Sequence, residues 1–396
     1  MLELNHLPEF GLGLDQADAA AFGAHVPDLV RSCVFPQGAD APTPLVPLPA
    51  LAAQLGIAGL YIKDEGQRLG LGSFKALGGT HAVIRCMLVE AAARLGRACI
   101  AQQVRDPEVS AVAATMTMAC ATDGNHGLAV AAGAQMVGAQ AAIFVHSHVS
   151  AARVDALAAR GARVIHVAGN YDDAVAEARR ACAAEGWTLI ADTSWPGYEH
   201  TPMLVMQGYT VLVREALDQL PTLPTHWFVQ AGVGGLAGAV AAYLSCVLGT
   251  HRPTLVIVEP HRAACLYQSA VAGKRVRIAP AAATVMAMLE CFEPSLVAWR
   301  ILCRTAYAFM MVEDADAIAA MRRLARPLSG DTAIVAGESG GAGLAGLVKV
   351  AGDPGARAAL DLGPDAQVML INTEGATDPG RYAQLVDAQG DLATDA

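Results

Sequence analysis

Short apolar runs alternate with longer helical spans through the middle of this chain, and this alternation restricts the fold most. Runs typical of buried strands occur at Ala141–Val145, Arg163–Val167 and Trp187–Ala191. Spans with helical spacing lie between these runs, and Gly161 and Gly186 end them. Alternating strands and helices form a parallel sheet that helices cover on both faces. The sequence therefore predicts an α/β protein with mostly parallel, twisted sheets flanked by helices.

A second series of strands and helices follows the aromatic, proline-bearing stretch Thr193–Pro202. It contains the predicted strands Trp227–Gln230, Leu255–Val258 and Val368–Ile371, and one more strand, Leu60–Lys63, precedes the first series. Two series of elements indicate two packing units in one chain.

The length of 396 residues also exceeds what one hydrophobic core usually supports. We expect a large domain made of residues 1–83 and 200–396 and a small domain made of residues 84–199. The small domain would close over a cleft. The proline-rich segment up to Pro49 is expected to be an irregular arm laid over the body.

The net charge and the cysteine spacing restrict the kinds of partner and site that we expect. A net charge of −10 disfavours a nucleic-acid or anionic-membrane partner, so we expect a small-molecule ligand. The nine cysteines show no paired spacing, so neither a disulfide scaffold nor a metal site is indicated. The amino-terminal residues lack the basic and apolar regions of a signal peptide. A cytoplasmic protein is expected.

Lys75 lies in the stretch SFKALGG, between a glycine-punctuated loop and a predicted helix over Phe74–Leu95. An amine at a loop-to-helix junction can be desolvated and can lie near helix N–H groups. Both effects favour the neutral amine that a Schiff-base lysine needs. Taken alone, Lys75 fits an ordinary surface lysine better, so its assignment depends on the other motifs.

Closely spaced glycines in QAGVGGLAG, Gln230–Gly238, follow a predicted strand and open a predicted helix. Backbone N–H groups at such a turn can bind a phosphate. The same letters also satisfy the dinucleotide pattern, and Glu259 ends the next strand, so a Rossmann oxidoreductase using NAD(P) is an alternative. A glycine turn that only packs a helix on a sheet is another.

Two further motifs follow predicted strands, at the sheet edge where open α/β proteins bind ligands. Asp123 and Asn125, in ATDGNHG, offer a carboxylate and an amide, although an Asx turn with Asn125 as N-cap is the alternative. Thr373, in INTEGATDPGRY, would present a hydroxyl to a ring nitrogen, or serve as an ordinary turn residue.

Taken together and in order, these stretches are similar to the fold type II pyridoxal-phosphate enzymes, the tryptophan synthase β family. The similarity extends over nearly the whole chain and includes SFKALGG, ATDGNHGLAVA, QAGVGGLAG, MAMLECFEP, GESGG and NTEGATDP. Within the family, the chain resembles the enzymes that eliminate ammonia from D- or L-2,3-diaminopropionate to give pyruvate.

The resemblance implies that pyridoxal 5'-phosphate is the cofactor and that Lys75 binds it. Phe74 would lie beside the ring, Asn125 would donate to the phenolic oxygen, and Thr373 would meet the pyridine nitrogen. The phosphate would be held by Gly232, Val233, Gly234 and Gly235. Lys75 would also be the base for the L-isomer and Asp123 the base for the D-isomer. A homodimer acting on a small amino acid is expected.

Some residues depart from the family pattern. Ala376 stands where an acid is expected, and three larger side chains stand where small residues are usual: Met288, Glu290 and Phe292. Cys265 and Cys291 match cysteines that can come together in the resembled enzymes, but in a reducing cytosol we expect two free thiols. A serine- or threonine-type dehydratase, another β-eliminating lyase and a non-catalytic binding module remain alternatives.

Overall fold

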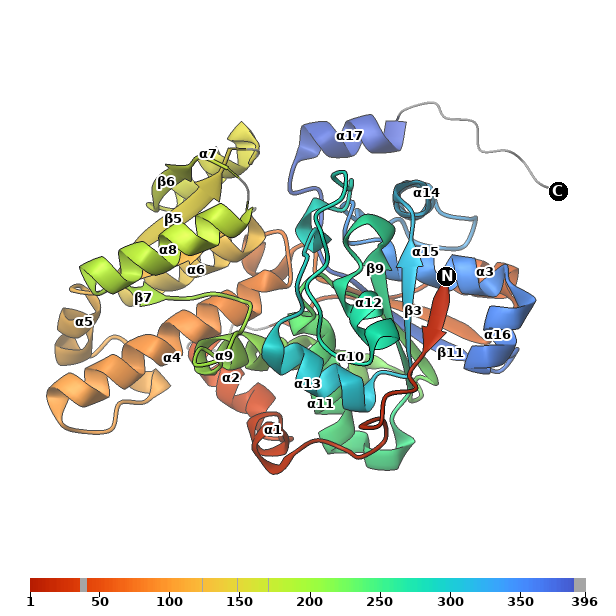
Figure 1. Ribbon diagram of the computed structural model, residues 1–396, viewed down its shortest axis with the longest axis horizontal. Helices are drawn as coiled ribbons and strands as arrows, with labels where there is room; N and C mark the ends of the chain where they lie inside the picture. Colours follow the sequence, from red (N-terminus) through yellow and green to blue (C-terminus); the bar gives the residue numbers. More distant parts are fainter. Residues whose placement is uncertain (36–40, 123, 148, 170, 388–396) are drawn as a thin grey trace.

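The computed structural model describes residues 1–35, 41–122, 124–147, 149–169 and 171–387, which contain two sheets with their helices (Figure 1). Within these residues the larger sheet has seven strands in the order β1-β10-β9-β8-β11-β3-β2. Its inner strands are all parallel, and β1 and β2 pair antiparallel at the two edges. The strands are β1 (Leu2–Leu4), β2 (Leu45–Pro47), β3 (Gly59–Asp64), β8 (His226–Gln230), β9 (Thr254–Pro260), β10 (Ala308–Val312) and β11 (Gln367–Asn372).

The smaller sheet has four parallel strands in the described part of the chain, in the order β6-β5-β4-β7. Neighbouring residues of a strand face opposite sides of a sheet. Met118 accordingly packs in the cluster that includes α6 (Asn125–Val137), and Ala119 packs in the cluster that includes α8 (Tyr171–Glu185). The sheet is therefore covered on both faces, as parallel sheets require. The strands are β4 (Thr117–Ala121), β5 (Gln140–His146), β6 (Arg163–Val167) and β7 (Thr188–Leu189).

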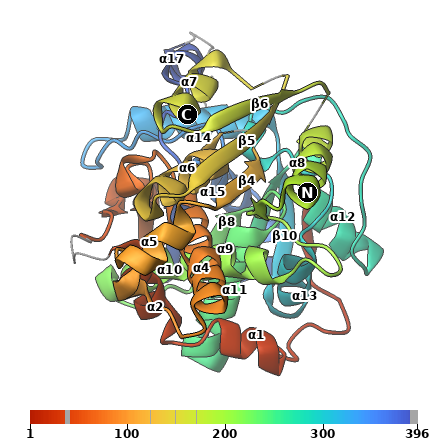
Figure 2. The same cartoon turned by 90° about the vertical axis from the view of Figure 1, so that its left-hand side faces the viewer.

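Helix α4 (Lys75–Leu95) lies between the two sheets and packs against α6 and α9 (His200–Gly208), as Figures 1 and 2 show. The contact with α9 is close: a Cβ built on Gly208 would lie 2.5 Å from the Cα of Gly78. A side chain at either glycine would push the two helices apart. This contact holds the helix that begins at Lys75 in position.

The remaining helices surround the larger sheet or cover the ends of the smaller one (Figure 1). None of the helices in the described residues is long and apolar enough to cross a membrane. Short 3-10 turns cover Arg68–Gly70, Ala101–Gln103, Gly249–His251, His261–Ala263 and Ala287–Leu289. The helices are α1 (Gln16–Ala21), α2 (Val26–Val34), α3 (Pro49–Leu55), α5 (Pro107–Ala113), α7 (Ala151–Ala159), α10 (Thr210–Gln219), α11 (Gly235–Leu248), α12 (Cys265–Ala272), α13 (Leu296–Thr305), α14 (Asp314–Ala325), α15 (Ala342–Ala351), α16 (Pro354–Leu360) and α17 (Pro379–Asp387).

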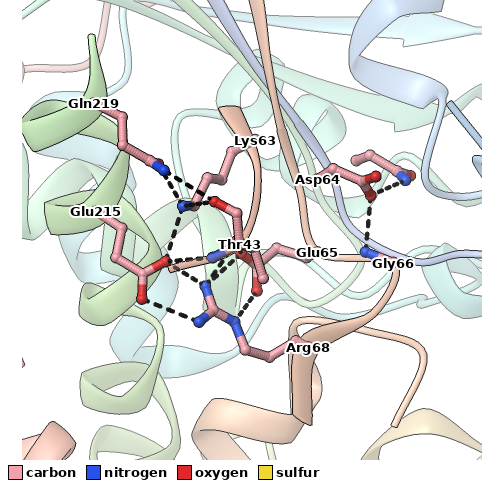
Figure 3. Close-up of polar contacts among 9 residues, drawn as sticks. Thr43, Lys63, Asp64, Glu65, Gly66, Arg68, Glu215 and Gln219 are labelled. Atoms are coloured by element: carbon pink, nitrogen blue, oxygen red, sulfur yellow. Dashed lines mark hydrogen bonds and ion pairs between the residues drawn. The ribbon is translucent and has the colours of Figure 1, made fainter. Parts of the chain in front are cut away.

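Charged side chains are buried together beside the loop that leads to Lys75 (Figure 3). The Arg68 guanidinium lies 2.7 Å from a Glu65 oxygen and 2.6 Å from a Glu215 oxygen. The Lys63 ammonium lies 2.8 Å from the same Glu215 oxygen. Burying such charges is tolerated only when each has a partner of opposite sign. The cluster therefore ties the loop after β3 to α10.

The structure confirms the predicted α/β class and the strand and helix alternation, with four differences. The segment up to Pro49 is not an irregular arm, because β1 and β2 pair with β10 and β3 and two helices lie between them. Strand β10 was not predicted. Helix α6 begins at Asn125 itself, whereas the Asx-turn alternative makes Asn125 the N-cap that precedes a helix, and β7 is shorter than predicted. The division into domains at residues 83/84 and 199/200 stays a prediction.

Candidate active site

Lys75 is the first residue of α4, and the backbone just before it is fastened to the end of β11. The Phe74 N–H donates to the Thr373 carbonyl at 3.0 Å, and Ser73 forms a β-bridge with Glu374. These contacts bring the Lys75 side chain to the carboxyl end of the larger sheet, where open α/β proteins bind ligands.

The glycine turn after β8 lies at the same edge of the sheet. Gly234 has φ +95°, and a Cβ there would lie 3.1 Å from the Ala298 side chain. Both facts favour glycine at this position. Helix α11 then begins at Gly235 and leaves its first backbone N–H groups without helical acceptors. Such a helix start attracts an anion.

An inner cavity brings these pieces together at the edge of the larger sheet. Every predicted site residue that the structure describes lines it, and so do several residues that the sequence analysis did not select. The predicted residues are Phe74, Lys75, Asn125, Gly232, Val233, Gly234, Gly235 and Thr373. Asp123 lies outside the described residues. The other lining residues are Asp192, Tyr209, Gln230, Ala231, Leu236, Met288, Leu289, Ser339 and Glu374.

Asp192 forms an ion pair with the Lys75 ammonium inside the inner cavity. Burial would lower the pKa of Lys75, but the Asp192 carboxylate outweighs burial and raises this pKa above its usual range. Burial would likewise raise the pKa of Asp192, and the Lys75 ammonium lowers it instead. Lys75 is therefore protonated in the cofactor-free protein. Asp192 follows a predicted strand directly, so its position at a strand end was the signal that could have identified it.

Glu374 is a second acidic residue that the sequence analysis did not select. Its Oε2 accepts from the Asn125 amide at 2.5 Å, and its Oε1 accepts from the Ser339 N–H at 3.3 Å. Burial raises the pKa of Glu374 from 4.5 to about 7; the Glu338 carboxylate adds to the rise, and Arg153 opposes it. Glu374 therefore orients Asn125 and carries a proton that titrates near neutral pH.

The Thr373 hydroxyl is placed to donate into the inner cavity. It lies 3.1 Å from the Gln230 amide nitrogen, which donates to it and leaves the hydroxyl proton available for another acceptor. Ser339, also on the cavity wall, is 1% exposed, and its Oγ has no hydrogen-bond partner among the described residues. A bound group with a ring nitrogen and an anionic tail would satisfy these donors.

An outer cavity of about 460 Å³ adjoins the inner one, and Val233 lines both. Three departures from the family pattern line these two cavities: Met288 lines the inner one, and Glu290 and Phe292 line the outer one. Cys265 and Cys291 form no disulfide, and the sulfur atoms of both lie close to Gly232. The Cys291 sulfur would lie 2.9 Å from a Cβ at Gly232, so this glycine leaves room for the thiol.

Comparison with known proteins identifies the family. A family model described as "Pyridoxal-phosphate dependent enzyme" matches residues 37–374. This chain belongs to the pyridoxal-phosphate dependent enzymes. The chain is 38% identical over 351 residues to diaminopropionate ammonia-lyase from Escherichia coli strain K12, and the match covers 87% of each chain.

Solved structures agree with the sequence comparison. The Escherichia coli diaminopropionate ammonia lyase, in complex with an aminoacrylate-PLP azomethine reaction intermediate, superimposes with a TM-score of 0.87 and 35% identity. This match covers 98% of the present chain and 96% of the other. The same enzyme in complex with D-serine gives a TM-score of 0.85 and 34% identity, with the same coverage.

These findings confirm the predicted fold type II architecture and the predicted pyridoxal phosphate cofactor. They decide against the Rossmann oxidoreductase. Glu259, whose position at a strand end supported that alternative, accepts from the Leu266 and Tyr267 N–H groups at 2.8 and 2.6 Å. Its carboxyl group therefore caps the start of α12 within the protein.

The residues of the inner cavity fit pyridoxal phosphate. The free N–H groups at the start of α11 suit the phosphate, the Thr373 hydroxyl suits the ring nitrogen, and the Lys75 amine suits the aldehyde. In addition, the buried Ser339 hydroxyl lacks a partner that a polar ligand would supply. The phosphate, the ring nitrogen and the aldehyde of the cofactor therefore each have a matching group in the inner cavity.

Proposed function

We propose that this protein is a lyase that removes ammonia from 2,3-diaminopropionate by α,β-elimination and releases pyruvate and ammonia. One observation carries the proposal: the Lys75 amine, the Gly232–Gly235 turn and the Thr373 hydroxyl line a single cavity in a chain closely similar to diaminopropionate ammonia-lyase.

Lys75 would bind the cofactor, and Gly232–Gly235 would hold its phosphate. Asn125 would donate to the phenolic oxygen while Glu374 holds the amide in place, and Phe74 would lie beside the ring. When bound, pyridoxal phosphate withdraws the electrons left on the substrate Cα after its proton departs. Among these residues only Lys75 would make a covalent bond.

Thr373 would direct the outcome toward elimination. Its hydroxyl is neutral, and Gln230 already donates to it, so it offers the ring nitrogen a hydrogen bond without supplying a full proton. An aspartate at this position would instead favour a protonated ring nitrogen. A neutral partner favours prompt loss of the β-amino group.

The Lys75 amine would take the Cα proton of the L-isomer. Asp192 would hold the Lys75 amine in place through the ion pair. Asp123 would take the Cα proton of the D-isomer from the opposite face. We expect Asp123→Asn to abolish ammonia release from D-diaminopropionate and largely spare the L-isomer. Equal loss on both isomers would contradict the two-base assignment.

The purified protein tests the function directly. It should show a visible absorbance band with pyridoxal phosphate and release ammonia and pyruvate from diaminopropionate. Lys75→Ala should remove both the band and the activity because no amine remains to bind the aldehyde. A protein without the band, or one whose ammonia release survives Lys75→Ala, would refute the proposal.

Elimination of water from serine is the second candidate. It is favoured by the structure of a similar enzyme in complex with D-serine. A substrate panel of diaminopropionate, D-serine, L-serine and L-threonine, followed by pyruvate or oxoacid formation, separates the two functions. The preferred substrate has the highest kcat/KM.

We also propose a homodimer in the cytoplasm, with a large domain of residues 1–83 and 200–396 and a small domain of residues 84–199. The cysteines of the described residues are all free, which suits a reducing compartment. Light scattering of the purified protein measures the oligomeric state, and limited proteolysis tests the domain boundaries.

A further inference from the structure

The outer cavity has an uneven distribution of charge. Arginines extend into it from α7, from α8 and from the segment 275–294. Arg275 pairs with Glu293 at 2.6 Å, Arg153 lies 3.7 Å from Glu338, and the Arg179 guanidinium lies 4.4 Å from the centre of the Trp195 ring. The cavity therefore suits a ligand with a carboxylate.

Glu290 also lines the outer cavity, but its side chain is acidic. Its Oε2 accepts from the Thr284 N–H at 2.9 Å, and no basic side chain of the described residues lies within ion-pair distance of its carboxylate. A carboxylate in this position can accept charge-assisted hydrogen bonds from a cationic group of a ligand.

The backbone holds Glu290 close to the inner cavity. Leu289, the preceding residue, lines the inner cavity, and the Cys291 sulfur lies against Gly232. Hydrogen bonds from the Glu290 N–H to the Ala287 carbonyl at 3.2 Å and from the Cys291 N–H to the Leu289 carbonyl at 2.9 Å keep this turn compact. Thr284, which orients the Glu290 carboxylate, is itself anchored by its hydroxyl to Asp314.

We propose that Glu290 binds the side-chain ammonium group of a diamino acid in the outer cavity and thereby favours diamino acids over serine. This inference rests on the proposed function. The arginines that line the same cavity supply positive charge for the substrate carboxylate. A hydroxyl in place of the ammonium group forms only a neutral hydrogen bond with Glu290, which is weaker.

Glu290→Gln tests the proposal with little change of shape, because the amide oxygen can still accept from Thr284. We expect kcat/KM for diaminopropionate to fall about tenfold, mainly through a higher KM, while kcat/KM for D-serine stays within about twofold. Glu290→Asp, which keeps the charge, should restore part of the loss. The control is Glu185→Gln, an exposed glutamate at the end of α8 that gives the same change of net charge.

Trp195 gives a second measurement that does not depend on turnover, since its ring lines the outer cavity. Titration of the cofactor-free protein with diaminopropionate should change its tryptophan fluorescence, and Glu290→Gln should weaken this binding about tenfold. Alanine, which lacks the second amino group, should bind wild type and variant equally.

The results separate this inference from the function on which it rests. A wild-type enzyme that releases no ammonia from diaminopropionate refutes the function, and the fluorescence titration then still tests Glu290. If the wild type is active and Glu290→Gln changes kcat/KM for diaminopropionate and D-serine by the same factor, or changes neither, the role of Glu290 is refuted.

Discussion

Glu374 should make the protein less stable as the pH rises through neutrality, and Glu374→Gln should remove this dependence. In the folded protein, burial and the Glu338 carboxylate raise the pKa of Glu374 from 4.5 to about 7. The folded state therefore holds a proton between these values that the unfolded chain has lost. The stabilisation is full below pH 4.5 and is lost as the pH rises to about 7.

The expected magnitude follows from the size of the pKa change. Each unit of difference between the folded and unfolded pKa is worth about 1.4 kcal/mol, so the free energy of unfolding should fall by about 3 kcal/mol across this window. Glutamine is neutral at every pH and keeps an oxygen that accepts from Asn125. The difference between variant and wild type should therefore grow by about 3 kcal/mol in favour of the variant.

Urea unfolding of the cofactor-free protein from about pH 5 to about pH 8 measures this difference. The matched control is Glu338→Gln. Removing the Glu338 charge lowers the pKa of Glu374, so the decline should be smaller and should finish at lower pH. A difference between Glu374→Gln and wild type that stays constant with pH would refute the reasoning.

Three further predictions concern other buried contacts. Asp192→Asn should lower the pKa of Lys75 because the carboxylate that raises it is gone. When pyridoxal phosphate is added to the cofactor-free protein, the variant should therefore develop the visible band at lower pH than the wild type. An unchanged pH dependence would contradict the ion pair. Gly78→Ala should lower the free energy of unfolding by about 1–3 kcal/mol in thermal unfolding, because the new Cβ would lie 2.5 Å from a backbone oxygen of α9. The control is Gly352→Ala, whose new Cβ would have its nearest atom at 3.6 Å and should change the stability little. Glu215→Gln should lower the free energy of unfolding by about 3 kcal/mol, measured in urea, because it removes a buried carboxylate that pairs with two cations. An unchanged urea midpoint would contradict this role of Glu215.

Local patterns determined most of the elements and indicated several of the residues that line the inner cavity. Strand β6 was predicted at its observed bounds, and the helix at Lys75 within one residue, because apolar spacing and helix-ending glycines act over a few neighbouring residues. The same holds for the Gly232–Gly235 turn, where Gly234 has φ +95°, a conformation that favours glycine. These features can be predicted from the sequence because their causes are local.

Edge strands were harder to predict than central ones. Strands β1 and β2 have only three residues each, too few for a periodic pattern, and they form because an edge of the larger sheet offers them a partner. The observed start of α6 also differs from the prediction. Asn125 is a residue type that is common in turns, and only the folded structure places its amide against Glu374.

Only the tertiary structure decided which groups meet in the inner cavity. Asp192 and Lys75 are separated by 117 positions, and Asn125 and Glu374 by 249, so no spacing in the sequence relates them. These pairs form because the order of the parallel strands brings distant strand ends to one edge and because α4 lies between the two sheets. The sequence alone determined the chemistry that each residue can offer. Strand order and helix packing determined which of these residues share a cavity, because a contact across the fold depends on the whole chain and not on neighbouring residues.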